Sequence, residues 1–73
     1  MPHVIVKLYP GRSLERKRAL SDRIVKALEE TIGSRRGDVS VSFEEVSPRE
    51  WEERVVKPDI LGKTDALFKR PEY

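Results

Sequence analysis

The 73-residue sequence has no cysteine, which excludes disulfide bonds and zinc sites built on thiolates. It has a single histidine, His3, so a metal site rich in imidazole is excluded as well and no metal is expected. A domain of this length buries only about 60% of the surface that its unfolded chain exposes, which makes a lone monomer marginally stable. With disulfides and metals excluded, we expect the chain to be stabilised by self-association.

A long apolar run is also missing, so no membrane span is expected. The N-terminal residues lack the basic lead, long apolar stretch and cleavage site of a signal peptide, which predicts a cytoplasmic protein. The net charge is only +2, and acidic residues are interleaved with basic ones. This interleaving is typical of solvated helix faces and disfavours a nucleic-acid partner. A basic binding module remains an alternative, which a salt-dependent affinity for nucleic acid would reveal.

The sequence does contain consecutive strand and helix patterns. Apolar side chains recur at every second position over residues 3–9, which predicts a strand that Pro10-Gly11 ends. Ser13 is a suitable N-cap for a following helix, in which apolar residues recur every four positions up to a C-terminal cap at Gly33. Residues 39–44 alternate again and predict a second strand.

A strand, a long helix and a second strand form a single β-α-β unit with parallel strands. The predicted fold class is therefore α/β, and residues 1–73 are expected to form one domain. The helix covers one face of the two-stranded sheet and leaves the other face without a cover inside the chain. An identical copy is the simplest partner, so we expect the fold to be completed by oligomerisation.

Short C-terminal helices are predicted after the second strand. Residues 47–50 read Ser-Pro-Arg-Glu, a capping box with proline at the first helical position. The helix that follows contains Trp51 and is expected to end at Pro58, because proline lacks a backbone donor. Asp59 is then a candidate N-cap for a last short helix, and residues 70–73 are expected to be irregular.

Pro2 is the unusual candidate for acid–base chemistry, because the initiator methionine is readily removed when a small residue such as proline follows it. Pro2 would then carry a free secondary amine. An N-terminal amine has a reference pKa of about 8, and an apolar pocket or nearby cations lower such a pKa toward neutral pH. A base with that pKa moves protons efficiently in both directions. Taken by itself, the Met-Pro start strongly favours an ordinary proline without a catalytic role, since proline in second place is common.

Four features occur together in this sequence. They are Pro2 at the start of a strand, Gly11-Arg12-Ser13 at its end, the long amphipathic helix and the second Val-rich strand. From Pro2 to about Trp51, this pattern resembles the 4-oxalocrotonate tautomerase family without a gap. Beyond Trp51, residues 66–73 look like the C-terminal stretch of the PptA-type bacterial tautomerases, which are dimers. The resemblance implies an isomerase that catalyses keto–enol tautomerisation of a small carboxylate and needs no cofactor.

The resemblance also implies roles for individual residues. Pro2 is the general base and then the general acid of a 1,3-keto–enol proton shift. Arg12 holds a substrate carboxylate, a task that its planar guanidinium suits, and an exposed turn arginine is the alternative. Trp51 excludes water from the pocket, and a core-packing tryptophan is the alternative. Ser40 stands where the shorter family members carry a second arginine, which normally polarises the carbonyl.

The absence of that second arginine makes a diacid such as 4-oxalocrotonate a doubtful substrate and favours a monocarboxylate such as phenylenolpyruvate. Ser40, Arg35 or Arg36 could donate the missing hydrogen bond. Pro2 and Arg12 should lie at opposite ends of one strand, roughly 20 Å apart at about 3.3 Å per residue. We therefore expect composite active sites between subunits, in a dimer in preference to a hexamer.

Two further functions remain open at this point. One is a non-catalytic oligomeric protein that keeps the tautomerase fold, since Pro2 is an amide nitrogen and no base if Met1 is retained. The other is a different reaction of the same superfamily, dehalogenation or decarboxylation. Such enzymes need further acidic or cationic groups to activate water, and the sequence identifies none.

Overall fold

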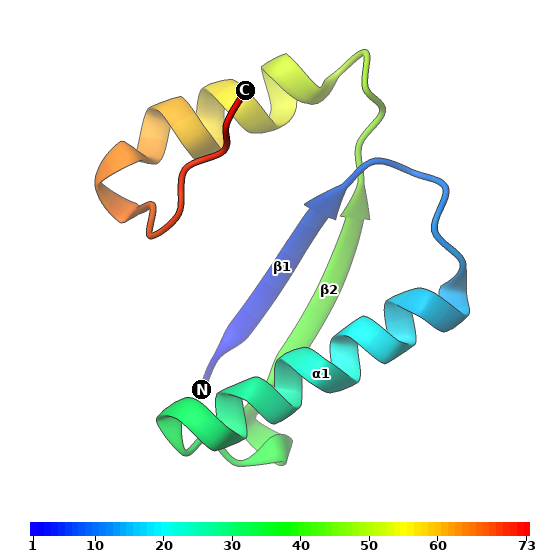
Figure 1. Ribbon diagram of the computed structural model, residues 1–73, viewed down its shortest axis with the longest axis vertical. Helices are drawn as coiled ribbons and strands as arrows, with labels where there is room; N and C mark the ends of the chain where they lie inside the picture. Colours follow the sequence, from blue (N-terminus) through cyan, green and yellow to red (C-terminus); the bar gives the residue numbers. More distant parts are fainter.

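The computed structural model describes residues 1–73, and Figure 1 shows two adjacent strands, one long helix and a helical C-terminal segment. The regular elements are β1 (His3–Leu8), α1 (Leu14–Ile32) and β2 (Ser40–Glu45). The short or irregular helices are η1 (Arg36–Asp38), η2 (Glu52–Ile60) and η3 (Leu61–Ala66). The α/β class and the β-α-β order are therefore confirmed. No helix is both long and apolar enough to span a membrane.

The two strands pair in parallel, with His3 opposite Ser40 at one end and Leu8 opposite Glu45 at the other. Alternate side chains of a strand point to opposite faces, and directly paired residues share a face. The Glu45 carboxylate lies 2.6 Å from Nζ of Lys17 in α1, which identifies the face that α1 covers. The apolar residues of the strands that share this face are Val4, Val6, Leu8, Val41 and Phe43.

Both ends of α1 form as their residues predict. The Ser13 side chain accepts a hydrogen bond from the backbone N–H of Arg16 at 3.1 Å, which satisfies one of the free donors of the first turn. Gly33 ends the helix in the left-handed conformation with φ 69°, where a side chain would be strained, and its N–H donates to the carbonyl of Leu28. The predicted boundaries of this helix are confirmed.

The second face of the sheet is covered only in part. Lys7 of β1 forms a 2.5 Å ion pair with Asp59 of η2, so η2 lies against this face. Ile5, two residues before Lys7, nevertheless remains 54% exposed. The expectation that this face has no cover inside the chain is therefore correct only in part, because Val55 and Asp59 of η2 lie beside Ile5 and Lys7. The face still presents apolar surface.

The expectation that a helix ends at Pro58 is also wrong. η2 continues as a π-helix through Pro58 to Ile60, and Asp59 lies inside this helix instead of capping a new one. A π-helix has wider turns than an α-helix. In an α-helix the proline ring would clash with a carbonyl of the preceding turn, and the wider turn relieves that clash.

Very few side chains are sequestered from solvent within one chain. Only Val46 and Val55 are buried, 2 of the 73 residues. A single chain therefore hides little apolar surface, and burial of such surface is the main stabilising contribution to folding. Several large apolar side chains remain exposed, namely Ile5, Leu14, Leu20, Ile32, Leu61 and Phe68. This distribution favours association with further copies.

Candidate active site

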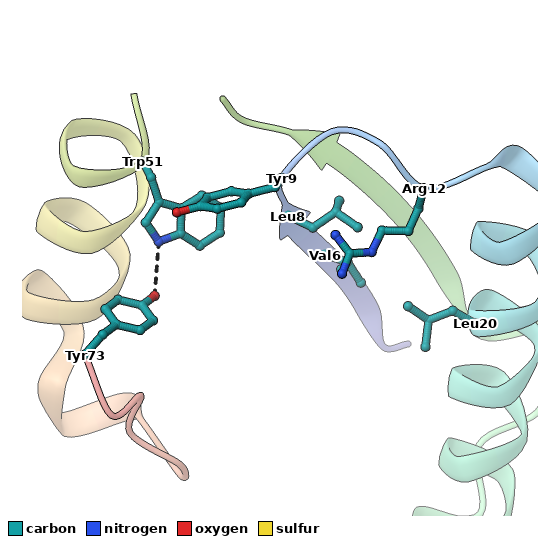
Figure 2. Close-up of a pocket in the computed structure, with 7 residues that line it drawn as sticks. All are labelled: Val6, Leu8, Tyr9, Arg12, Leu20, Trp51 and Tyr73. Carbon is teal, nitrogen blue, oxygen red and sulfur yellow. Dashed lines mark hydrogen bonds between the residues drawn. The ribbon is translucent and has the colours of Figure 1, made fainter. Parts of the chain in front are cut away.

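An open pocket of about 520 Å³ lies at the end of β1, between the first half of α1 on one side and the C-terminal helical segment on the other (Figure 2). Its lining residues are Val6, Leu8, Tyr9, Arg12, Leu20, Trp51 and Tyr73. Six of these seven are hydrophobic, and Arg12 is the only charged one. An apolar pocket of this size with one fixed cation suits a small organic anion.

Arg12 is held by the turn between β1 and α1. Gly11 takes φ 125°, a conformation that residues with side chains rarely adopt, and Ser13 caps α1 on the other side. Figure 2 shows the Arg12 side chain extending from this turn toward Leu8 and Val6. None of the salt bridges in the chain uses Arg12. Its guanidinium is therefore free to bind an external carboxylate through two parallel hydrogen bonds.

Three aromatic residues form the opposite wall of this pocket. Tyr9 and Trp51 pack edge to face, with ring centroids 5.0 Å apart and an interplanar angle of 88°. The indole Nε1 of Trp51 donates a hydrogen bond to the hydroxyl oxygen of Tyr73 at 3.0 Å (Figure 2). Arg12 and Trp51, two of the predicted site residues, therefore line the same pocket.

Pro2 and Ser40, the other two predicted site residues, lie together at the far end of the sheet. The backbone N–H of Ser40 donates to the carbonyl oxygen of Pro2 at 3.1 Å. The hydroxyl oxygen of Ser40 lies 2.6 Å from Nδ1 of His3, next to Pro2 in the chain. Pro2 is half-buried, whereas the side chain of Met1 is 97% exposed.

The four residues thus form two pairs at opposite ends of β1. Pro2 precedes the strand and Arg12 follows it, so the six strand residues between them span about 20 Å. A small carboxylate cannot contact Pro2 and Arg12 of the same chain at once. The loop cation Arg36 is engaged in an ion pair with Glu29 at 2.9 Å, whereas Ser40 lies at the same end of the sheet as Pro2.

Tyr73 is the pocket residue that the sequence patterns did not identify. The tail was expected to be irregular, and residues 71–73 indeed have no regular secondary structure. The tail nevertheless folds back so that Tyr73 reaches Trp51, which lies 22 positions earlier in the chain. A contact between residues this far apart, one of them outside any helix or strand, leaves no periodic signal in the sequence.

Two of the groups with perturbed pKa values lie away from the pocket, where Lys7 of β1 meets Asp59 of η2. The hydrogen bond from Lys7 lowers the pKa of the Asp59 carboxyl, and the same hydrogen bond raises the pKa of Lys7. Lys63 and Glu44 add weaker interactions, at 3.7 Å from Asp59 and Lys7 respectively. These charges fix η2 against the sheet. The chain contains no cluster of three or more side chains that could hold a metal ion.

Known proteins resemble this chain over its whole length. Residues 2–56 match the sequence pattern of a family described as tautomerase enzyme. A probable tautomerase from Xylella fastidiosa is 40% identical over 73 residues, which is 100% of this chain and 89% of that protein. Tautomerase PptA from Pectobacterium atrosepticum is 35% identical over 74 aligned positions, covering 100% of this chain and 97% of that protein.

The fold has counterparts among solved structures as well. The crystal structure of YwhB, described as a homologue of 4-oxalocrotonate tautomerase, superposes with a TM-score of 0.61 at 37% identity. The superposition covers 63% of this chain and 75% of that one.

Proposed function

Because this chain belongs to the tautomerase family of isomerases, we propose that it catalyses a 1,3-keto–enol proton shift on a small 2-oxo or 2-hydroxy-enoate such as phenylenolpyruvate. The observation that carries the proposal is the apolar pocket with Arg12 as its single charged residue. One cation matches one carboxylate, and the apolar walls match a substrate whose remainder is uncharged. A diacid would leave its second carboxylate without a partner in this pocket.

In the proposed reaction, Pro2 acts as a free secondary amine after removal of Met1. It takes the proton of the enol hydroxyl, and the electron pair of that O–H bond forms the carbonyl. The carbon–carbon double bond takes up a proton at C3 from the prolyl ammonium, which regenerates the amine. The net reaction moves one proton and consumes no co-reactant, so no cofactor is required.

The other site residues divide the remaining tasks. Arg12 binds the substrate carboxylate, and Trp51 excludes water from the apolar part of the pocket. Ser40 donates a hydrogen bond to the substrate oxygen on which negative charge develops. The backbone hydrogen bond between Ser40 and Pro2 and the contact of the Ser40 hydroxyl with His3 support this assignment, since they hold Ser40 at the same end of β1 as the proposed base.

We further propose that each site is composite, with Pro2 and Ser40 from one chain and Arg12 and Trp51 from a second copy. The separation of the two pairs along β1 supports this arrangement, as do the exposed apolar side chains and the minimal core. A homodimer in which two sheets pack antiparallel would bring the ends of the strands together. Activity would then depend on association.

Ketonisation of phenylenolpyruvate, followed by the loss of enol absorbance, tests this function. The proposal expects a rate well above the spontaneous one, with single-carboxylate enols preferred over 2-hydroxymuconate. If the protein binds such carboxylates and accelerates none of these shifts, a non-catalytic tautomerase-fold protein or a different reaction becomes the better account.

A further inference from the structure

Tyr73 occupies an unusual position for a side chain so near the end of a tail. Tyr73 is 77% exposed, so burial alone does not order its side chain. Its hydroxyl nevertheless accepts the hydrogen bond of Trp51, and its ring lines the Arg12 pocket. The ring also borders a second hollow lined by Ile60 of η2 and Leu61 of η3, so the tail lies beside both helices. Figure 1 shows the tail running back along these helices.

Tyr73 completes an aromatic group centred on Trp51. Tyr9 meets the indole edge to face, and Tyr73 satisfies the one polar atom that the indole carries. The hydrogen bond to Tyr73 and the edge-to-face contact with Tyr9 together orient the indole of Trp51. The three rings come from three separate parts of the chain: the residue after β1, the residue before η2, and the tail.

The wall formed by these three rings favours one class of ligand over another. Aromatic rings gain edge-to-face or offset-stacked contacts with a ligand ring, beyond the contribution of buried area. An aliphatic chain of similar length gains only the free energy of burying its apolar surface. Arg12 on the other side of the pocket fixes the carboxylate, so a ligand is oriented with its acid group on Arg12 and its far end against the rings.

We infer that Tyr73 is a specificity-determining residue, whose ring closes the pocket over the aryl group of an aromatic 2-oxo acid and makes the site select aryl over alkyl substrates. This inference rests on the proposed function for its substrate class. It adds a selective role for the tail, which the assignment of Pro2, Arg12, Trp51 and Ser40 does not include.

Trp51 is the only tryptophan in the chain, so its fluorescence reports occupancy of the pocket without requiring turnover. The experiment titrates the unreactive acids 3-phenylpropanoate and butanoate into the wild-type protein, Tyr73→Ala and Tyr73→Phe. The matched control is Phe68→Ala, which removes another exposed aromatic ring of the C-terminal segment that does not line the pocket. Equal thermal midpoints establish that the variants fold.

For Tyr73→Ala we expect about 3- to 10-fold weaker binding of 3-phenylpropanoate, the range that one aromatic contact provides. Binding of butanoate should change by less than about twofold, because it does not reach the ring wall. Tyr73→Phe should recover most of the lost affinity, and Phe68→Ala should behave as wild type. The inference is overturned if Tyr73→Ala weakens both acids equally or neither, or if Tyr73→Phe binds no better than Tyr73→Ala.

The same proteins separate this inference from the proposed function. If 3-phenylpropanoate binds through Tyr73 and phenylenolpyruvate is not ketonised, the proposed reaction fails while the selectivity of the pocket stands. If phenylenolpyruvate is ketonised and the Tyr73 variants discriminate aryl from alkyl acids as wild type does, the reaction stands and the role of Tyr73 is refuted.

Discussion

Ser40 is tied to Pro2 by its backbone and to His3 by its side chain. Its N–H donates to the Pro2 carbonyl at 3.1 Å, and its hydroxyl lies 2.6 Å from Nδ1 of His3. The parallel register, with His3 opposite Ser40, produces both contacts. The hydroxyl is therefore fixed relative to the proposed base before a substrate arrives, so little reorganisation is needed during the reaction.

Ser40→Ala should lower kcat about 10-fold with a smaller change in KM, because the hydroxyl interacts most strongly with the oxygen as its charge develops. Steady-state kinetics on phenylenolpyruvate measures both constants. Ser42→Ala is the matched control, since Ser42 lies on the same face of β2 two residues further along and makes no side-chain hydrogen bond to His3. Equal losses in the two variants would contradict the role of Ser40.

Arg12→Ala should raise KM and lower kcat/KM about 10- to 100-fold, because hydrogen bonds to a charged carboxylate contribute roughly 1.5–3 kcal/mol. Arg12→Lys should recover only part of this loss, since an ammonium cannot form the planar two-point contact. Arg18→Ala removes the same charge from an exposed position of α1 outside the pocket and serves as control. A normal KM in Arg12→Ala would exclude carboxylate binding at this residue.

A composite site predicts complementation between two inactive variants. Pro2→Ala and Arg12→Ala, unfolded together in equal amounts and refolded, should recover about a quarter of the wild-type activity if the protein is a dimer. Half of the dimers are then mixed, and each mixed dimer has one site in which both residues are intact. Each variant refolded alone provides the baseline. If the mixture stays at that baseline, the two residues serve the same chain or do not act together.

The Lys7–Asp59 pair predicts a pH-dependent contribution to stability. The pKa of Asp59 is lowered, so the ionised carboxylate stabilises the folded chain at neutral pH. This stabilisation is lost as the pH falls through the lowered pKa, below about pH 4. The pKa of Lys7 is raised, so the contribution of the lysine persists into alkaline solution and is lost only as the pH rises through the raised pKa.

Asp59→Asn should therefore lower the thermal midpoint at pH 7, and the difference from wild type should shrink in acid. Glu53→Gln is the control, because Glu53 forms an ion pair with Lys57 at 2.5 Å, the same distance as in the Lys7–Asp59 pair. The Glu53–Lys57 pair lies within η2 on an exposed surface. Exposed pairs of this kind contribute little. A midpoint difference for Asp59→Asn that is constant from neutral to acid pH would show that the carboxylate charge is not the cause.

The elements that could be predicted from the sequence are those with local signals. The alternation in β1 and β2, the four-residue spacing in α1 and the caps Ser13 and Gly33 each depend on neighbours in the chain. Their parallel arrangement then follows from the general rule for a strand–helix–strand crossover.

The contacts that sequence reasoning missed join distant residues. Asp59 was expected to cap a helix, but its partner Lys7 lies 52 positions away, and that contact holds η2 against the sheet. Tyr73 belongs to an irregular tail and becomes a pocket residue only through Trp51. For the candidate site, Arg12 and Trp51 line one pocket, whereas Pro2 and Ser40 lie together at the other end of the strand.

The most direct test of the account is the ketonisation rate of three forms of the protein whose N-termini are established by intact mass. These are the form that begins at Pro2, the same form with Pro2→Ala, and a form that retains Met1. The account predicts that only the first is fully active, and that the others are slower by about 10²-fold or more, the range of general acid–base catalysis. Equal rates in all three would contradict it, because a retained Met1 converts the Pro2 nitrogen into an amide without basicity.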